Sequence, residues 1–231
     1  MPDARLAAVS DPYRRSGRVP ALPQDYTSYS IADDSSAMIV TRKPPFDVCP
    51  LLVSKNVVAI YCEGPTFTFI FVSMYAPPHS PLENVLEELT NVLSLSRSPH
   101  VIVAGDFNSK HRLWGQVESD EHGLLLAQIA LAQRLLPLND AESLPTYETP
   151  YTASWIDLTL AKPSVVSTAF RWTVHDDTTY SEHRLVEVRI GLPPEPGRGE
   201  LAMPNENCCV HFRGTAGSVG LRARPWGPRM P

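Results

Sequence analysis

The sequence is short of features that mark several large classes of protein. Its four cysteines are two isolated residues and one adjacent pair, a pattern that suits neither a disulfide framework nor a zinc site. No apolar run approaches the ~18 residues of a membrane span. The first twenty residues carry Pro, Asp and Arg in place of a signal peptide's apolar centre. These absences favour an intracellular protein in a reducing compartment, with no membrane partner.

Positive charge is also scarce for a protein that would hold nucleic acid by bulk attraction. The chain has 25 acidic and 20 basic residues, a net charge of −5 and a pI near 5.8. Such a balance still permits an enzyme that gathers carboxylates at a metal site and contacts phosphate through local Arg and Lys. With 43% hydrophobic residues in 231, the chain can build one good-sized domain, with or without a tail.

Hydrophobic periodicity predicts a chain made mostly of strands. Amphipathic helices are expected at 81–95 and 123–135, and residues 1–36 read as polar and loop-like. Alternating or β-branched runs predict strands at 37–41, 57–62, 67–75, 101–103, 154–160, 170–175 and 184–190. The second and third of these are expected to form a hairpin through Glu63-Gly64-Pro65. The pattern favours an α+β layered sandwich over an alternating parallel fold.

The composition changes at Leu192. Of the 40 residues from there to the end, seven are Pro and six are Gly, with no hydrophobic period. This composition predicts a disordered tail over 192–231. We therefore expect an N-terminal segment over 1–36, a domain over 37–191 and this tail.

The stretch Val101–Ser109 is the centre of the functional interpretation. A short β-branched run meets Gly105, and Asp106 and Asn108 follow with Phe107 between them. On an extended backbone Asp106 and Asn108 project to the same side, while Phe107 turns inward. A carboxylate beside a carboxamide suits a hydrated cation or a phosphate oxygen, although a plain strand with an Asx turn explains the same residues.

Three further polar residues stand at or near the ends of predicted strands, where scaffolds often present reactive groups. Tyr75 ends one strand, Asp157 lies within an apolar strand, and His183 directly precedes the last strand. Singly, they read as a turn aromatic, a structural hydrogen-bond acceptor and a surface histidine. Together with Asp106 and Asn108, they are the parts of a metal-assisted phosphodiester hydrolase.

The order of these motifs resembles the endonuclease/exonuclease/phosphatase superfamily. The resemblance rests on Tyr75-Ala-Pro-Pro, Gly105-Asp-Phe-Asn-Ser-Lys-His, Ile156-Asp-Leu-Thr159 and Ser181-Glu-His-Arg184. Within it, the chain is most similar to the apurinic-like endonuclease domain of insect non-LTR retrotransposons, of which the spacer Leu144-Pro-Thr-Tyr-Glu148 is also typical. The likeness extends from about Asp11 to about Ile190.

The resemblance implies a role for each residue. His183 would be the general base that deprotonates water, and Asp157 would orient it. Asp106 and Asn108 would position the water and contact the scissile phosphate, and Tyr75 would contact phosphate. The implied fold is a four-layer α/β/β/α sandwich of the DNase I-like type. The implied cofactor is Mg²⁺, with Mn²⁺ as the alternative.

The chain also departs from the family pattern. The family's opening strand, its metal-site Asn and the following helix are expected to be absent, which would leave neighbouring strands with unpaired edges and lower the stability. The usual metal-binding Glu is Asp11, shorter by one methylene, roughly 1.5 Å of reach. Glu182, the second candidate metal residue, stands where the family has Asp. A reverse transcriptase, normally fused to such a domain, is not found in the chain.

The loop after the central motif offers candidate DNA contacts. Lys110, His111 and Arg112 are expected beside the cleft, with Trp114 as a wedge or a packing residue. An ordinary solvated loop explains the same residues equally well.

The sequence therefore predicts a Mg²⁺-dependent DNA endonuclease of retrotransposon origin, acting in the nucleus and weakened by truncation. One alternative is a non-catalytic remnant that at most binds nucleic acid. A second is a phosphatase or lipid phosphodiesterase of the same superfamily.

Overall fold

The computed structural model describes residues 4–32, 34–64, 67–95, 98, 100–167, 170–176, 181–191 and 207–214. Its strands and helices are β1 (Ala4–Ser10), β2 (Tyr26–Tyr29), β3 (Ala37–Arg42), β4 (Asp47–Val53), β5 (Val57–Glu63), β6 (Thr68–Tyr75), α1 (Leu82–Leu95), β7 (Val101–Asp106), the 3₁₀ turn η1 (Arg112–Trp114), α2 (Glu121–Ala132), β8 (Leu136–Pro137), β9 (Tyr147–Thr149), β10 (Thr152–Ser154), β11 (Asp157–Ala161), α3 (Pro163–Val166), β12 (Phe170–Val174), β13 (Val186–Gly191) and β14 (Asn207–Gly214).

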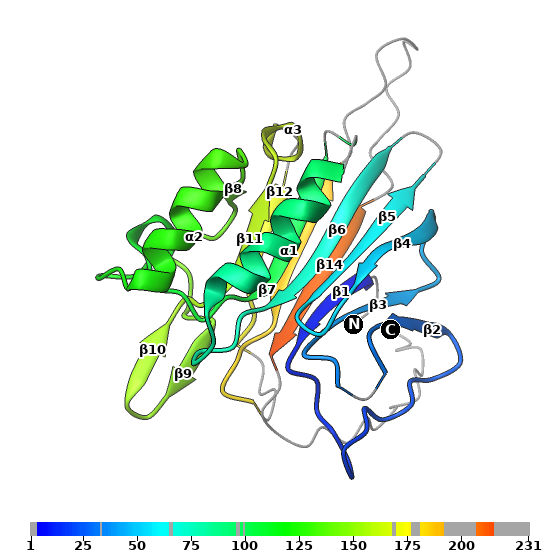
Figure 1. Ribbon diagram of the computed structural model, residues 1–231, viewed down its shortest axis with the longest axis horizontal. Helices are drawn as coiled ribbons and strands as arrows, with labels where there is room; N and C mark the ends of the chain where they lie inside the picture. The colour runs from blue at the N-terminus through cyan, green and yellow to red at the C-terminus, as the bar shows by residue number, and fades with distance from the viewer. Residues whose placement is uncertain are drawn as a thin grey trace, which may run out of the picture.

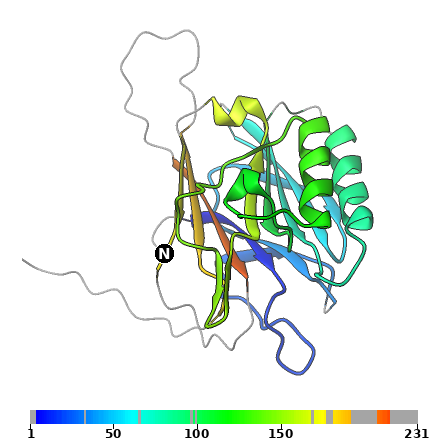
Figure 2. The same ribbon diagram turned by 90° about the vertical axis from the view of Figure 1, so that its left-hand side faces the viewer.

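Two six-stranded sheets stack face to face (Figures 1 and 2). Sheet A has the order β12-β13-β14-β1-β3-β2, and sheet B has the order β4-β5-β6-β7-β11-β8. In sheet B, β6 and β7 are parallel, because α1 carries the chain back between them. The short hairpin β9–β10 stands apart from both sheets.

The main core lies between the sheets. Alternate residues of β1 (Leu6 and Ala8) and of β7 (Ile102 and Ala104) belong to one buried cluster that joins the two inner faces. Strand periodicity explains this arrangement, since residues two apart share a face. Ser10 and Asp106 are the next residues in these two rows and end β1 and β7. Their side chains therefore lie between the sheets at one edge of the molecule.

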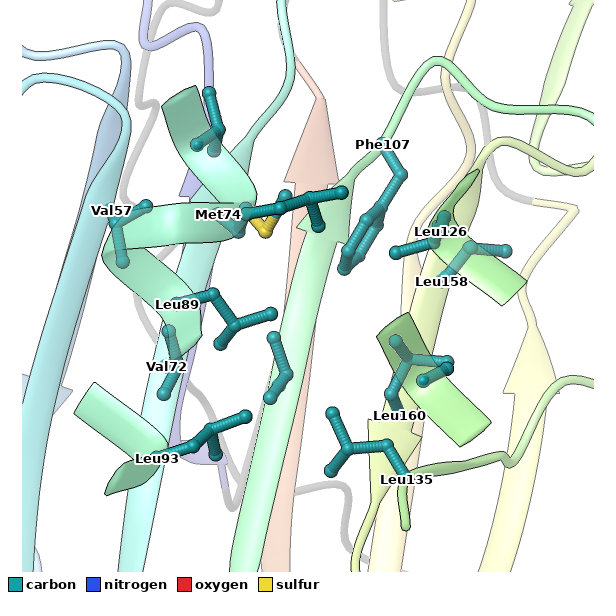
Figure 3. Packing of buried hydrophobic residues seen from close by; sticks show 14 of the residues in the cluster. Val57, Val72, Met74, Leu89, Leu93, Phe107, Leu126, Leu135, Leu158 and Leu160 are labelled. Atoms are coloured by element: carbon teal, nitrogen blue, oxygen red, sulfur yellow. The ribbon is translucent and has the colours of Figure 1, made fainter. Parts of the chain in front are cut away.

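Helices α1 and α2 cover the outer face of sheet B (Figure 2). Leu89 of α1 and Leu126 of α2 pack on Val72 and Leu158 of the sheet, and Phe107 closes the same layer (Figure 3). Fully burying a leucine or a phenylalanine contributes about 1.5–3 kcal/mol. Phe107, buried in this layer, therefore anchors the end of β7 on the helical side of sheet B.

The structure confirms the expected α+β class and the stacked sheets. All seven predicted strands and both predicted helices are present, with ends shifted by a few residues. Strands β5 and β6 form the expected antiparallel pair, and Pro65 of its turn lies outside the described residues. Of the four layers, the described residues form three, because no helix described here covers the outer face of sheet A.

Three expectations about the flanks of the domain are wrong. Residues 4–10 and 26–29, expected to be loop, form β1 and β2 and pair with β3. Residues 207–214, expected to be disordered, form β14 between β13 and β1, while the rest of 192–231 lies outside the described residues. The expected loss of an opening strand does not leave unpaired edges around β1 and β13, because β1 pairs with β3 and β14, and β13 pairs with β12 and β14. The domain core extends beyond 37–191.

Within the described ranges, no helix has both the length and the apolar character that a membrane crossing requires.

Candidate active site

The site begins as a row of side chains across three neighbouring strands of sheet B. Asp106 pairs with Tyr75 of β6 on one side and with Asp157 of β11 on the other. Asp106 continues the inward-facing row of Ile102 and Ala104, so its carboxylate reaches the edge of the space between the sheets. Asp106 and Asp157 are only 4% and 3% exposed. Two carboxylates at this depth require compensating partners.

Gly105 allows the strands that carry this row to lie close together. Its φ is +150°, and a Cβ at this position would lie 1.8 Å from the backbone oxygen of Met74. Because β6 and β7 pair at this point, any side chain would push Tyr75 away from Asp106. The glycine is thus required by close approach of two backbones.

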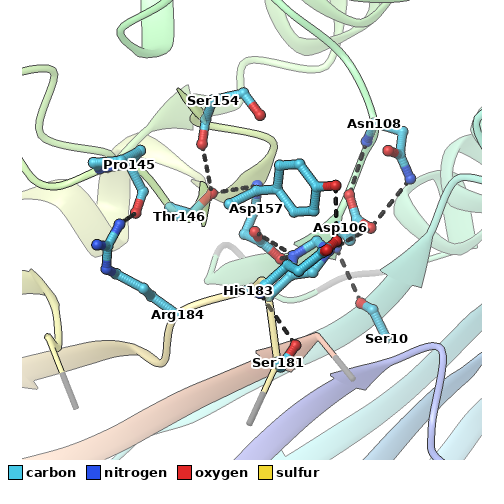
Figure 4. A network of polar contacts seen from close by, with 12 residues as sticks. Ser10, Asp106, Asn108, Pro145, Thr146, Ser154, Asp157, Ser181, His183 and Arg184 are labelled. Atoms are coloured by element: carbon cyan, nitrogen blue, oxygen red, sulfur yellow. Dashed lines mark hydrogen bonds and ion pairs between the residues drawn. The ribbon is translucent and has the colours of Figure 1, made fainter. Parts of the chain in front are cut away.

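Asp106 is held by three groups, two from Asn108 and one from Ser10 (Figure 4). The Asn108 backbone N–H donates to Oδ1 over 3.0 Å, and Asn108 Nδ2 donates to Oδ2 over 3.1 Å. Asn108 adopts a left-handed φ of 44°, which asparagine tolerates better than most residues. From the other sheet, Ser10 Oγ accepts the Asp106 backbone N–H over 3.0 Å. Both sheets therefore fix Asp106.

His183 lies between the two buried carboxylates. Its Nδ1 is 2.9 Å from Asp157 Oδ2 and 3.2 Å from Asp157 Oδ1, while its Nε2 is 4.0 Å from Asp106 Oδ2. The predicted imidazole–carboxylate pair is thus present, and it adjoins the Asp106–Asn108 pair. With Nδ1 on Asp157, Nε2 is the ring nitrogen that faces Asp106.

The segment 145–148 frames this pair from the outside. Thr146 Oγ1 accepts the Asp157 backbone N–H over 3.0 Å. The Tyr147 ring contacts the His183 ring edge-on at 4.8 Å, and its hydroxyl donates to Glu182 Oε2 over 2.9 Å. Arg184 donates to the Pro145 carbonyl over 2.9 Å and pairs with Glu148. The segment thus fixes both members of the His183–Asp157 pair.

Burial and mutual charge shift the acid–base equilibria of the site. Burial alone would lower the pKa of His183, but the charge and hydrogen bond of Asp157, with Asp106 and Glu182, raise it to about 9. Burial, and after it the charge of Asp157, raise the pKa of Asp106 to about 7, although His183 and Asn108 act in the opposite direction. The protein alone therefore favours a protonated imidazole at neutral pH.

Tyr75 presents its hydroxyl to the same space. Burial, followed by the charges of Asp11 and Asp106, raises its pKa to about 12. The phenol therefore remains a hydrogen-bond donor at any physiological pH.

The two expected metal ligands have different surroundings. The Asp11 carboxylate is 52% exposed and lies 3.6 Å from Arg14 Nη1, whereas Glu182 accepts the Tyr147 hydroxyl. Among the described residues, no three His, Cys, Asp or Glu side chains form a group that could hold a metal ion. The donors available near Tyr75 fit a largely hydrated Mg²⁺ on one or two carboxylates, the usual way this ion binds.

The loop after Asn108 divides into exposed and buried residues. Lys110 and Arg112 are exposed, and His111 Nδ1 accepts the Leu113 backbone N–H as a cap of η1. Trp114 is 1% exposed and donates from Nε1 to the Ser109 carbonyl over 3.0 Å. Of the two expected roles of Trp114, wedge or packing residue, the structure supports the packing residue, because its ring is buried.

Sequence reasoning missed four residues that support the site. Thr146 and Tyr147 lie in the Leu144–Glu148 spacer, whose sequence alone indicates no role for either side chain. Arg184 belongs to the Ser181–Arg184 motif, in which the acid and the imidazole are the groups that suggest chemistry. Ser10 carries no local signal at all, because its contact with Asp106 spans 96 positions.

The residues of this site lie in the part of the chain that matches a known family. Residues 69–187, about half of the chain, match the endonuclease–reverse transcriptase family. The chain belongs to this family. The matched residues run from β6 into β13 and include Tyr75, Asp106, Asn108, Asp157 and His183.

In one relative, the sequence similarity covers more of the chain than the family match does. The chain is 26% identical over 190 residues to the retrovirus-related Pol polyprotein of the type-1 retrotransposable element R1 from Bradysia coprophila. The alignment covers 76% of this chain and 19% of that polyprotein. The family member described here therefore spans about a fifth of the relative's length.

Solved structures confirm the fold of this endonuclease–reverse transcriptase family member. The endonuclease domain of TRAS1, a telomere-specific non-LTR retrotransposon, aligns with a TM-score of 0.68 and 24% identity, covering 80% of this chain and 84% of that one. The 3′ phosphatase NExo of Neisseria, bound to a product DNA hairpin, aligns with a TM-score of 0.54 and 15% identity over 80% of this chain and 98% of its own. The architecture is that of the endonuclease/exonuclease/phosphatase superfamily.

Proposed function

We propose that this protein is a Mg²⁺-dependent phosphodiesterase that nicks DNA as the endonuclease of a retrotransposon. The observation that carries the proposal is the position of His183, with Nδ1 on Asp157 and Nε2 facing Asp106. An imidazole oriented on one nitrogen and available on the other is the arrangement of a general base. Target-primed reverse transcription uses such a nick in chromosomal DNA, so we place the activity in the nucleus.

In the proposed reaction, His183 Nε2 takes a proton from a water molecule. The water oxygen then forms a bond to phosphorus while the bond from phosphorus to the leaving oxygen breaks, and that oxygen takes a proton from solvent. Asp157 holds the imidazole through Nδ1 and stabilises the imidazolium that forms. Asp106 accepts a hydrogen bond from the same water, because its Oδ2 is the carboxylate oxygen nearest to Nε2.

Donors around the phosphate complete the mechanism. Asn108 donates its two amide hydrogens to the Ala76 carbonyl over 3.0 Å and to Asp106 Oδ2 over 3.1 Å, so it holds the Asp106 carboxylate in place beside the phosphate. The Tyr75 hydroxyl stays protonated and donates to a phosphate oxygen as negative charge grows there. Exposed Lys110 and Arg112 lie on the following loop and suit contacts to neighbouring DNA phosphates.

Mg²⁺ is proposed as the cofactor, with Mn²⁺ as a substitute. When bound, the ion would polarise the phosphate and offset the charge of Asp106, one of the carboxylates that raise the pKa of His183, and would so lower that pKa towards neutrality. Asp11 is the ligand we assign, directly or through water, because its carboxylate is half exposed and its charge acts on Tyr75. Glu182 is assigned to hold Tyr147 against His183.

Relaxation of supercoiled plasmid tests this function. The purified chain should nick plasmid with Mg²⁺ and lose the activity in EDTA, and His183→Ala should lower the rate by roughly 10³-fold. His175→Ala is the matched control. That imidazole pairs with Glu187 on strand β13 rather than with the site carboxylates, so its loss should leave the rate unchanged.

Three results would decide against the proposal. Equal nicking by the wild type and His183→Ala would point to a contaminating nuclease. A folded wild type that binds DNA without nicking it in Mg²⁺ or Mn²⁺ would favour a non-catalytic remnant, and release of phosphate from 3′-phosphorylated DNA without nicking would favour a phosphatase.

A further inference from the structure

Strand β14 lies outside the residues matched to the family, yet it occupies the middle of sheet A. It pairs in parallel with β1, from Ala4 opposite Cys209 to Ser10 opposite Gly214. On its other side it pairs antiparallel with β13, from Val186 opposite Phe212 to Gly191 opposite Asn207. Figure 1 shows it in orange beside the blue β1. The backbone of residues 209–212 is therefore paired on both sides.

Removing β14 would divide sheet A. Strands β2, β3 and β1 would remain on one side and β12 with β13 on the other, because β14 is the described strand that joins them. The gap between β1 and β13 would be one strand wide. The two strands would lie about 9.6 Å apart, because neighbouring strands in a sheet are about 4.8 Å apart. Leu6 and Ala8 on one edge and Val186 and Val188 on the other belong to the same buried cluster. An open slot here would expose that core and leave backbone groups unpaired.

The sequence of β14 matches the slot in register. Its apolar residues Val210 and Phe212 take the positions opposite the buried Val188 and Val186, and His211 takes the position opposite Glu187. A strand that is apolar at every second position is what a half-buried slot of this kind accepts. The surrounding tail sequence, rich in Pro and Gly, shows no such alternation.

We propose that the slot between β1 and β13 is a strand-binding surface, and that residues 207–214 are its ligand, separable from the domain and exchangeable in trans. Fifteen residues, 192–206, link β13 to β14 in the chain. The strand therefore completes the sheet as a tethered peptide does in strand addition, where backbone hydrogen bonds give affinity and alternate side chains give specificity. This inference does not depend on nuclease activity.

Hydrogen exchange on the full chain tests the proposal. Val210→Pro removes a backbone N–H within the doubly paired region and blocks the ladder. Amides of β1 and β13 should lose roughly a hundredfold of their protection, while those of β5 and β6 keep theirs. Val219→Pro, in the sequence after the strand, is the control and should exchange like the wild type.

A peptide of residues 205–216 tests exchangeability. Added to the Val210→Pro protein, it should restore protection in β1 and β13, and the same peptide with Pro at position 210 should not. Protection in Val210→Pro equal to that in Val219→Pro would overturn the proposal. So would a Val210→Pro protein that is unfolded throughout and stays so when the wild-type peptide is added.

Discussion

At the scale of single residues, the length of the side chain at Asp11 tests whether this residue binds metal. Its carboxylate lies 3.6 Å from Arg14 Nη1, and its charge contributes to the raised pKa of Tyr75. Asp11→Glu adds one methylene, and we expect the longer acid to lower the Mg²⁺ concentration for half-maximal nicking by roughly tenfold. Calorimetric titration with Mg²⁺ in the absence of DNA should show the same direction.

The control for this change is Asp34→Glu, at an exposed acid that pairs with Lys55. It should alter neither the nicking curve nor the calorimetric titration. Unchanged Mg²⁺ binding in Asp11→Glu would show that Asp11 is not a ligand.

His183 predicts how stability depends on pH without metal. Its folded-state pKa of about 9 lies above the ordinary 6.5, so protonation stabilises the fold fully below pH 6.5 and the gain disappears as pH rises through 9. The raised pKa of Asp106, about 7 against 3.8, acts in the same direction at lower pH. In EDTA, thermal unfolding should therefore shift to lower temperature between pH 6.5 and 9. His183→Ala should reduce that shift, and a wild-type curve that is flat over this interval would refute the assignment.

At the scale of elements, Gly105 shows how strand pairing sets the site. Gly105→Ala places a methyl carbon against the Met74 carbonyl, and we expect a loss of roughly 3 kcal/mol or more of unfolding free energy. Gly17→Ala is the control, because φ is also positive but nothing lies within 4 Å. It should cost only about 1–2 kcal/mol. Urea denaturation measures both values, and equal losses would show that the clash is relieved elsewhere.

The segment before β9 predicts a positioning effect. Thr146→Val removes the acceptor of the buried Asp157 N–H and should cost about 1–3 kcal/mol. Because Thr146 acts through Asp157, we expect kcat to fall by roughly tenfold with KM unchanged. Thr152→Val, exposed on β10, should change neither. A change in KM alone would indicate a direct contact with DNA.

Sequence reasoning predicted the elements whose signal is local. The β-branched run of β7 and the leucine spacing of α1 are visible in short windows, and the strand ends carry Tyr75, Asp106 and Asp157 into one row. By contrast, β1 alternates only weakly because small residues fill it, and β14 lies in a Pro- and Gly-rich region whose average composition conceals one alternating strand. The support from Ser10, Thr146 and Arg184 depends on contacts between distant segments, which no window contains.

At the scale of the whole molecule, two buried layers share sheet B and should unfold together. Trp114 lies in the layer between the helices and sheet B, and Trp172 lies between the sheets, where its Nε1 donates to Thr159 Oγ1 over 3.1 Å. Two variants, one with Trp114 and the other with Trp172 as its only tryptophan, should show the same urea midpoint when unfolding is followed by fluorescence. Separate midpoints would indicate that the helical layer and the inter-sheet layer are independent units.

The parallel pairing of β1 and β14 has a practical corollary for handling the protein. Both strands run towards the edge where Ser10 meets Asp106, so Ala4 lies at the opposite end of β1 while Gly214 lies near the Asp106 edge. If DNA binds at this edge as proposed, a fluorophore or affinity tag placed before Ala4 should lie away from it, whereas one inserted directly after Gly214 should crowd it. Labels used to follow cleavage should therefore be attached before Ala4, and labels that report proximity to DNA should be inserted directly after Gly214.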